Sequence, residues 1–371
     1  MSRLVLLARK LSQGGTERQI VVLAKALKKN GHDVHVVLFY AGGVFDSELA
    51  TIDVPVHFVE KGGRWDVVGF LIRLRGILRE LRPVTVYSFL DVPNILAALL
   101  CPWIGRPRLI WGLRAAGTEM HHYDWLARLM HWLESYLSRV ADLVIANSQA
   151  GSTWAVSRGF RETRMAVVEN GIDTIRFHPD PKGGETVREG WKVMKNQRLI
   201  GLVARLDAMK DHRNFLQACA FLAAKRDDLR FVCVGGGASA YHAELVKLTE
   251  DLGISEQMIW AGWHQDMPAI YSALDINCSS SFGEGFSNSV SEAMACGTPC
   301  VVTDVGDSAR IVGELGEVAP PRDAEALSSA MARMLDRLEG DTDIRCLVRE
   351  RIVTEFSVER MVQRTEQLLF E

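Results

Sequence analysis

The sequence has little of what marks several classes of protein. No apolar run reaches the roughly 20 residues that a membrane-spanning helix needs, and the run at 95–104 is interrupted by Pro102. The seven cysteines are scattered without a CxxC pair, which argues against a disulfide framework and against a zinc site. No low-complexity tract or short repeat is present. We therefore expect a globular protein in a reducing compartment, with no metal and with its cysteines in the core.

The length and the charge distribution suggest two different halves. At 371 residues the chain is longer than one core usually grows, so two domains are expected. Residues 1–172 carry 21 Lys and Arg against 15 Asp and Glu, whereas the remainder carries 22 against 31. These differences of +6 and −9 add up to the net charge of −3. The first half should favour anionic partners, and the second should not.

Apolar runs alternate with glycine turns and helical patterns. Residues 3–9 form an apolar run, which a glycine-rich turn, a helical pattern over 19–29 and a second apolar run over 33–39 follow. This order predicts strand, turn, helix and strand, a unit whose strands are parallel. A charged, glycine-rich loop follows the first run where a signal peptide would have its cleavage site, so we interpret that run as a buried strand.

Further strand-like runs fall into two sets, 84–89, 109–113 and 143–146 in the first half, and 199–204, 231–234, 258–261, 276–279 and 299–302 in the second. The predicted fold class is α/β, with two Rossmann-like domains that have parallel sheets and face each other across a cleft. Residues 1–172 would form the first domain and 197–353 the second. The stretch 173–196, rich in Pro, Gly and charge, is expected to be the linker.

The strongest chemical signal is the segment 281–299, where a glycine-rich turn brackets Glu284 and leads into a helix. Exposed amides of Phe286, Ser287 and Asn288 can bind an anion or sugar hydroxyls there. Glu292 is expected about two turns down the helix. The two carboxylates suit hydroxyl recognition, Glu284 for a hexose and Glu292 for a ribose. The alternative is a capped helix with a salt bridge on its surface.

A second signal is the pair Arg205 and Lys210. Arg205 follows the end of a predicted strand and Lys210 precedes a helix, so both can reach one anion. Two fixed cations would stabilise a departing diphosphate much as a divalent metal does. Taken alone, such residues are more often surface charges.

Taken in order, these motifs resemble the retaining glycosyltransferases of family four, the glycosyl transferases group 1, which have the GT-B fold. The resemblance runs the full length of the chain. Its motifs are the Gly14-Gly15 loop, Asn170-Gly-Ile-Asp, Arg205 with Lys210, Gly235-Gly236-Gly237 after a strand, and Glu284 with Glu292. The segment that begins at Phe356 resembles the closing helix of the family, which implies that residues 354–371 pack back on the first domain.

The resemblance implies a role for each matching position. Arg205 and Lys210 would hold the donor pyrophosphate, Glu284 the transferred sugar and Glu292 the ribose, while Gly15 lets the backbone approach the phosphate. The implied donor-binding residues are Gly15, Arg205, Lys210, Gly235, Gly236, Phe286, Ser287, Asn288 and Glu292. No protein nucleophile is obvious in such enzymes, because the departing phosphate is thought to deprotonate the acceptor on the same face.

One position departs from the family pattern. Many relatives have a histidine at the end of a first-domain strand near the reacting sugar, whereas the strand here ends in Arg114. His121 and His122 follow in a different local setting. Arg114 is therefore either a further catalytic residue, in contact with phosphate or acceptor, or a member of a salt bridge.

Two other motifs resemble known binding motifs but lack the expected sequence context. Gly235-Gly-Gly-Ala-Ser-Ala fits the dinucleotide-binding fingerprint, but no acidic residue ends a following strand at the expected distance. Asp341-Thr-Asp343 has the form of a metal-binding DxD, but it follows a polar helical stretch instead of an apolar strand. We interpret it as a solvated loop and expect activity without a metal.

Residues 65–82 mix apolar residues with four arginines, at 73, 75, 79 and 82. Such a segment is either a basic amphipathic helix on an anionic bilayer or a Rossmann helix whose arginines face water. The stretch 123–136, with two tryptophans, admits the same two interpretations.

The function that these expectations favour is transfer of a sugar from a nucleotide diphosphate donor, of the uridine type, to a lipid-linked or saccharide acceptor. We expect a cytoplasmic enzyme at the inner membrane face, with no cofactor and no nucleic-acid partner. One alternative is a sugar-nucleotide epimerase of the same fold. Another is a non-catalytic sugar-nucleotide-binding protein, which would have no chemical reason to keep Arg205, Lys210, Glu284 and Glu292.

Overall fold

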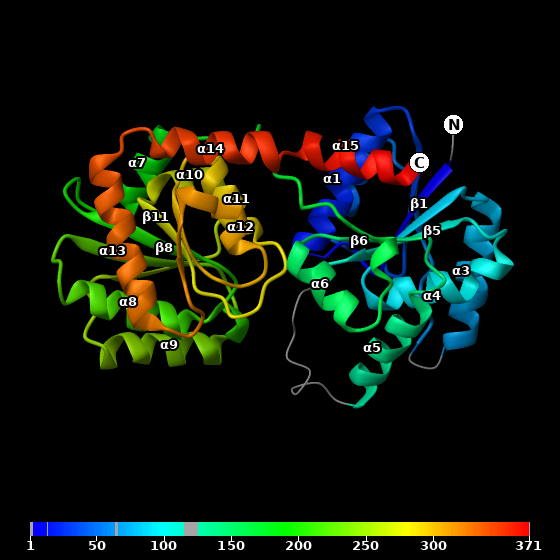
Figure 1. Cartoon of the computed structure of the whole chain (residues 1–371), viewed down its shortest axis with the longest axis horizontal. Helices are drawn as coiled ribbons and strands as arrows, with labels where there is room; N and C mark the ends of the chain where they lie inside the picture. The colour runs from blue at the N-terminus through cyan, green and yellow to red at the C-terminus, as the bar shows by residue number, and fades with distance from the viewer. Residues whose placement is uncertain (1–2, 13, 64–65, 115–124, 371) are drawn as a thin grey trace. The chain divides into compact units, whose positions relative to one another are not determined.

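The structure, a computed structural model, describes residues 3–12, 14–63, 66–114 and 125–370, and the side chains of these residues except those of 125–128. The chain divides into two compact units, Met1–Gly171 with Val358–Glu371, and Ile172–Ser357. In each unit the described strands form one parallel sheet with helices packed around it (Figure 1). This is the α/β architecture that the alternating sequence pattern predicts.

The first unit is built on a sheet whose described strands have the order β3-β2-β1-β4-β5-β6-β7. The chain adds β2 on one side of β1 and later β4 on the other, both parallel to it. The carboxyl ends of β1 and β4 therefore flank a topological switch point, where open α/β sheets bind ligands. The elements are β1 (Arg3–Ala8), α1 (Gly15–Lys29), β2 (Asp33–Leu38), α2 (Asp46–Ala50), β3 (Val56–Phe58), α3 (Val67–Leu81), β4 (Thr85–Phe89), α4 (Asp91–Leu100), η1 (Cys101–Trp103), β5 (Arg108–Leu113), α5 (Trp125–Leu137), β6 (Leu143–Ala146), α6 (Gln149–Ser157), η3 (Glu162–Arg164) and β7 (Met165–Val167).

The last helix, α15 (Val358–Phe370), also belongs to the first unit, where it packs against α1 (Figure 1). Met361, Val362 and Leu369 are buried in the core that covers this face of the sheet. Arg364 pairs with the buried Glu169 at 2.6 Å. The closing helix thus returns to the first unit, as the resemblance implies.

The second unit has a sheet with the described order β10-β9-β8-β11-β12-β13. Its switch point lies between β8 and β11, which pair parallel to each other. The elements are α7 (Pro181–Gly190), β8 (Arg198–Val203), η4 (Ala208–Lys210), α8 (His212–Ala223), β9 (Leu229–Val234), α9 (Ser239–Asp251), β10 (Met258–Gly262), α10 (Met267–Ala273), β11 (Ile276–Ser279), α11 (Asn288–Ala295), β12 (Cys300–Thr303), α12 (Ser308–Val312), η5 (Gly313–Leu315), β13 (Glu317–Ala319), α13 (Ala324–Gly340) and α14 (Ile344–Glu355).

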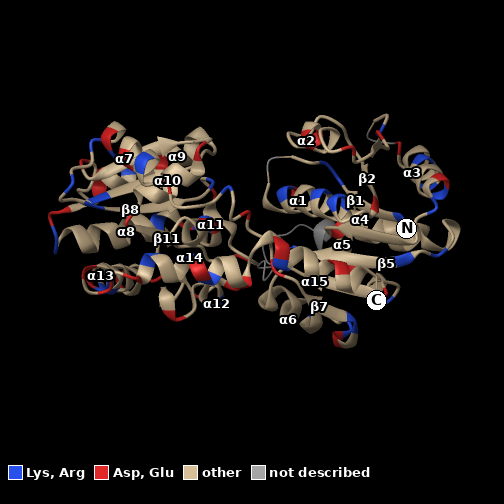
Figure 2. Ribbon diagram, turned by 90° about the horizontal axis from the view of Figure 1, so that it is seen from above, with Lys and Arg blue, Asp and Glu red and all other residues tan. Residues whose placement is uncertain are grey.

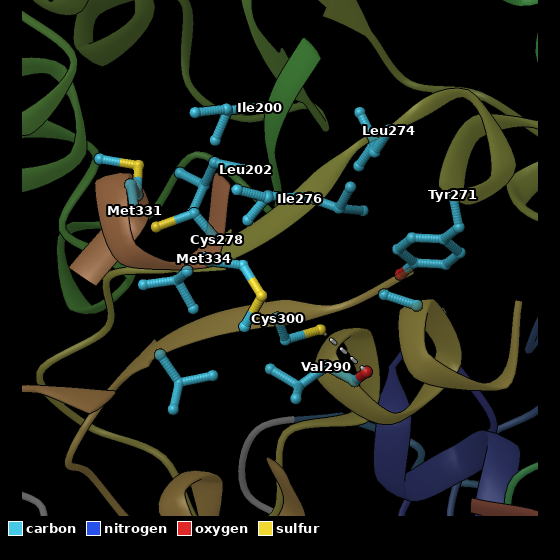
Figure 3. Close-up of a cluster of buried hydrophobic side chains, with 14 of the residues drawn as sticks. Ile200, Leu202, Tyr271, Leu274, Ile276, Cys278, Val290, Cys300, Met331 and Met334 are labelled. Carbon is cyan, nitrogen blue, oxygen red and sulfur yellow. Dashed lines mark hydrogen bonds between the residues drawn. The ribbon is translucent and has the colours of Figure 1, made fainter. Parts of the chain in front are cut away.

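The core of the second unit contains cysteines among its aliphatic side chains. Figure 3 shows Cys278 and Cys300 among Leu202, Met331 and Met334, with Cys300 Sγ donating to the carbonyl of Val290. Burial raises the pKa of both thiols, which makes them inert. All seven cysteines are free, but the expectation of core positions fails for two of them, because Cys101 is half-buried and Cys346 is exposed.

The segment expected to be a linker is structured and lies within the second unit. Residues 181–190 form α7, which packs against α10. Asp180 caps the helix by accepting a hydrogen bond from the Gly183 amide at 2.9 Å, and Pro181 occupies its first turn. A helix that begins with proline and glycine resembles a loop in composition. The sequence pattern therefore suggested a linker.

The arginine-rich segment forms α3, a helix that packs on the first sheet. Phe70, Leu74, Leu78 and Leu81 are buried and form its core-facing side. One apolar face of α3 is therefore already used in packing, which favours the interpretation as a Rossmann helix, although Val68 and Ile72 are exposed. None of the helices in the described residues is both long and apolar enough to cross a membrane.

Candidate functional site

Three loops of the second unit meet beyond the carboxyl ends of the neighbouring strands β9, β8 and β11. The loop after β8 bonds to the glycine loop after β9, where Leu206 N donates to Gly236 O at 2.9 Å. It also bonds to the loop after β11, where Phe282 N donates to Met209 O at 3.0 Å. Ser280 Oγ donates to the carbonyls of Lys210 and Asp211 at 2.8 and 2.9 Å. The segments that contain Arg205, Lys210, Gly235 and Glu284 are thus brought together.

Lys210 and Glu284 form an ion pair at the centre of these loops. Their side chains are only 25% and 12% exposed, so the pair is much better shielded from water than an ordinary surface salt bridge. Ser281 Oγ donates a second hydrogen bond to Glu284 Oε1 at 3.1 Å. The Lys210 ammonium can therefore bind an anion, and the Glu284 carboxylate can accept hydrogen bonds from hydroxyl groups.

Arg205 is placed differently from Lys210. It pairs with Asp207 at 2.8 Å, and its side chain is 73% exposed. Arg205 is therefore at the rim of the site, free to turn toward a ligand at little cost, whereas Lys210 is fixed. The structure brings their segments together, but each cation has its own carboxylate.

The glycine loop after β9 permits a close backbone approach. Gly235 has φ +144°, and a Cβ built there would lie 1.9 Å from the carbonyl oxygen of Ala204. Only glycine fits at this position. At Gly236, by contrast, an added Cβ meets nothing within 4 Å, so this residue faces open space.

Helix α11, which follows the glycine-rich turn around Glu284, begins later than the sequence suggested. It starts at Asn288, so Glu292 lies about one turn into the helix, not two. The N-cap residue Ser287 makes no side-chain capping bond. Glu292 accepts a hydrogen bond from Tyr271 Oη at 3.0 Å. Phe286 and Ser287 are buried, which limits the approach to their amides.

Next to the candidate site lies His212, which begins α8 two residues after Lys210. The sequence patterns did not single it out. It is fully buried, and its ring packs edge-on against Tyr241. Burial, together with the charge of Lys210, lowers the pKa of His212 to about 4, although Asp207 partly opposes the shift. The side chain is therefore neutral at pH 7.

This shift predicts how stability changes with pH. Between pH 6.5 and 4 the unfolded chain binds a proton at His212 that the folded chain does not, so the free energy of unfolding falls as the pH is lowered. A shift of about 2.5 units corresponds to about 3 kcal/mol over that window. Urea unfolding at pH 7 and pH 4 should show a smaller loss for His212→Leu than for the native chain. Equal losses in both would contradict the shift.

In the first unit, Arg114 follows β5 and has neutral partners. Its guanidinium donates to Asn170 Oδ1 at 2.9 Å and to Tyr87 Oη at 3.3 Å, and it lies 5.4 Å over the Phe89 ring. Among the described residues no carboxylate pairs with Arg114, so the salt-bridge interpretation finds no support there. Two family-like motifs, far apart in sequence, thus meet through Arg114 and Asn170. His121 and His122 lie outside the described residues.

A cavity of about 690 Å³ opens at the switch point of the first sheet. The segments that follow β1 and β2 line it with Arg9, Lys10 and Tyr40, and the end of β4 lines it with Phe89. Thr16 and Glu17 of the first turn of α1 also line it, and Gly15 begins that helix. Sequence analysis missed Arg9, Lys10 and Tyr40. Lys10 and Tyr40 stand directly after predicted strands, which is the signal that would have found them, whereas Arg9 was assigned to the first predicted strand and follows β1 only in the structure.

A second cavity, of about 720 Å³, lies at the opposite, amino-terminal ends of the strands of the second unit. Arg188, Arg198 and Arg345 all point to one carboxylate, Asp275, at 3.0 to 3.5 Å. Arg188 also donates to two backbone carbonyls. Three guanidinium groups of the cavity wall therefore converge on a single carboxylate.

Comparison with known proteins identifies the family of the chain. The profile of Glycosyltransferase Family 4 matches residues 13–176, and that of Glycosyl transferases group 1 matches residues 197–337. The lipopolysaccharide core biosynthesis mannosyltransferase LpsB of Rhizobium meliloti is 28% identical over 264 residues, which are 69% of this chain and 71% of the relative. The UDP-Gal:alpha-D-GlcNAc-diphosphoundecaprenol alpha-1,3-galactosyltransferase of Escherichia coli is 22% identical over 304 residues, 80% of this chain and 78% of the relative.

Solved structures show the same fold. Crystal structures of HepE from Anabaena with UDP and with UDP-glucose superpose with TM-scores of 0.88 and 0.87 at 22% identity, over 100% of this chain and 99% of theirs. The two parallel-sheet units with the returning α15 define the GT-B class of enzymes. The chain belongs to the glycosyl transferases group 1, and it is a glycosyltransferase.

Proposed function

We propose that the second unit binds a UDP-sugar and that the enzyme transfers the sugar, with retention of configuration, to a lipid-linked or saccharide acceptor in polysaccharide or glycolipid synthesis. The observation that carries the proposal is the shielded Lys210–Glu284 pair beyond the ends of β8 and β11. Lys210 and the exposed Arg205 head group would neutralise the diphosphate, and Glu284 would hold the sugar hydroxyls. HepE binds UDP and UDP-glucose on the same fold, which supports the uridine base.

Retention would follow from a front-side reaction. The bond between sugar C1 and the phosphate oxygen breaks, the acceptor oxygen bonds to C1 on the same face, and its proton passes to the departing phosphate. Glu284 is engaged by Lys210 and Ser281, which suits a binding role better than that of a nucleophile. The first-unit cavity lined by Arg9 and Lys10 would take the acceptor.

The proposal is tested with donor and acceptor varied separately. In a thermal-shift screen of UDP, GDP, ADP and CDP sugars, only the true donor class should raise the melting temperature of the protein. Sugar transfer should then require an acceptor, and the anomeric proton coupling of the product should match that of the donor. Sugar or nucleotide release at full rate without an acceptor would favour the epimerase, and binding without any turnover would favour the non-catalytic alternative.

Transfer should not require a metal ion, because Lys210 and Arg205 provide the positive charge at the proposed diphosphate position. The only DxD sequence offers no support for a metal, since Asp341 Oδ1 accepts the Asp343 amide at 2.9 Å and closes the turn between α13 and α14. In roughly 5 to 10 mM EDTA, an excess over any bound metal, initial transfer rates are expected to be unchanged within about twofold. Complete loss that Mn²⁺ restores would refute this expectation.

We also propose that the enzyme works at the cytoplasmic membrane face and that α5 carries the contact. Leu129, Trp132 and Tyr136 are exposed and follow one another at helical spacing on α5, and the rings of Trp132 and Tyr136 stack at 5.7 Å. Val140, in the turn after the helix, is exposed as well. Arg139 lies 5.7 Å from the Tyr136 ring. An exposed aromatic stripe with a cation suits the interface of an anionic bilayer.

The arginines of α3 would contribute charge only. Figure 2 shows Lys and Arg along α1 and α3 of the first unit. Arg73, however, pairs with Asp66 and donates to the carbonyls of Val59 and Glu60, so it has a structural task. Arg79 and Arg82 are exposed and are the better candidates for lipid phosphate, at about 1 kcal/mol each.

Vesicle co-sedimentation tests this surface. The native chain should bind vesicles that contain anionic lipid, more weakly at high salt, and Trp132→Ser/Tyr136→Ser should lower binding on the order of tenfold. Arg79→Ser/Arg82→Ser should reduce mainly the salt-dependent part. The matched control is Trp263→Ser in the second unit, where the tryptophan is 63% exposed. No binding at low salt, or equal loss in the control, would leave a soluble acceptor as the better hypothesis.

A further inference from the structure

Outside the residues proposed for transfer, the first unit contains a partly buried group of potential metal ligands. Asp91 stands in the first turn of α4, and His131 and Glu134 lie one helical turn apart on α5. One ligand atom from each lies within 4.8 Å of the other two. His131 Nδ1 is 3.9 Å from Asp91 Oδ2 and 3.9 Å from Glu134 Oε2.

The burial of Glu134 makes this group unusual. Glu134 is 1% exposed, and its Oε1 has no partner at hydrogen-bond distance among the described residues. The neighbouring Asn94 uses its Oδ1 to accept from Ser88, while its Nδ2 is also left without a bond. A buried carboxylate oxygen without a partner costs free energy that a bound cation would recover.

Arg158 does not fill this need. Its guanidinium donates to the carbonyl of His131 at 2.6 Å and lies 4.4 Å over the Trp154 ring. These contacts hold it 3.9 Å from Glu134 Oε2, beyond hydrogen-bond distance. Arg158 is also a single guanidinium beside two carboxyl groups, those of Asp91 and Glu134.

We propose that Asp91, His131 and Glu134 bind one divalent transition-metal ion, with Zn²⁺ as the best fit, and that the ion ties α5 to α4. An imidazole with two carboxylates is a ligand set that zinc accepts, with water as the fourth ligand. Tetrahedral bonds of about 2.0 to 2.2 Å place ligand atoms roughly 3.4 Å apart, so His131 Nδ1 and each carboxylate must approach each other by about half an ångström. The ion would be structural, since the charged loops proposed for transfer belong to the other unit.

The test is equilibrium dialysis of EDTA-treated, re-dialysed full-length protein against micromolar Zn²⁺, with bound metal measured by mass spectrometry. The native chain should bind one more zinc ion than His131→Ala, and Asp91→Asn should weaken binding at least tenfold. Zinc should also raise the melting temperature of the native chain but not that of His131→Ala. His178→Ala, an exposed histidine of the second unit, and Cys346→Ser, an exposed thiol, are the matched controls and should keep the extra ion.

Circular dichroism of the variants identifies any that fail to fold, and the half-exposed Asp91 provides a milder substitution than either buried ligand. Equal zinc in the native chain, His131→Ala and Asp91→Asn would overturn the proposal. So would the absence of any zinc-dependent rise in melting temperature for the native chain. Initial transfer rates in EDTA should stay unchanged while the melting temperature falls, which separates this ion from a catalytic metal.

Discussion

Glu284→Ala is expected to lower turnover on the order of 10³-fold, with UDP affinity unchanged or slightly tighter. The carboxylate is 12% exposed, is held by Lys210 and Ser281, and belongs to the loop after β11. If it holds the sugar as the reaction proceeds, its loss removes a preorganised contact in the transition state. The same change leaves the Lys210 ammonium without its carboxylate, so attraction for a diphosphate should not decrease.

The measurement pairs kcat with UDP affinity from calorimetry. Glu284→Gln keeps the shape and removes the charge, and Ser281→Ala removes only one hydrogen bond, so both should lie between the native chain and Glu284→Ala. Melting temperatures establish that each variant is folded. A loss of UDP affinity equal to the loss of turnover would count against the sugar-binding role.

Lys210→Ala should reduce turnover about 10²-fold or more, with a parallel loss of UDP affinity, by removing the fixed cation that stabilises the leaving diphosphate. Arg205→Ala should act in the same direction. Because Arg205 is 73% exposed and already has Asp207 as a partner, its ground-state contribution should be the smaller of the two. Lys210→Arg tests whether charge alone suffices at this half-buried position.

A matched control is Lys195→Ala, another lysine of the second unit, whose side chain is 98% exposed. It should leave both kcat and UDP affinity unchanged. Lys210→Ala also leaves Glu284 without its ion-pair partner in a shielded site, so folding must be verified by melting temperature. Native rates in both Lys210→Ala and Arg205→Ala would refute the donor-site assignment.

The long central strands could be predicted from sequence, whereas the short edge strands could not. Each predicted strand run corresponds to an observed strand within a residue or two, because a buried parallel strand is apolar on both faces. β3, β7 and β13 were missed. Each has three residues and lies at a sheet edge, so its order depends on pairing with a neighbour more than on its own pattern.

For the site, the sequence by itself determined which residue types follow which strands, and therefore the candidates Arg205, Lys210, Gly235 and Glu284. It did so because glycine turns and charges after apolar runs are local features. Only the tertiary structure decided the partners. Lys210 pairs with Glu284 across 74 positions, Arg114 bonds to Asn170 across 56, and Asp91 faces His131 across two helices. Such contacts depend on strand order and helix packing, which no local pattern contains.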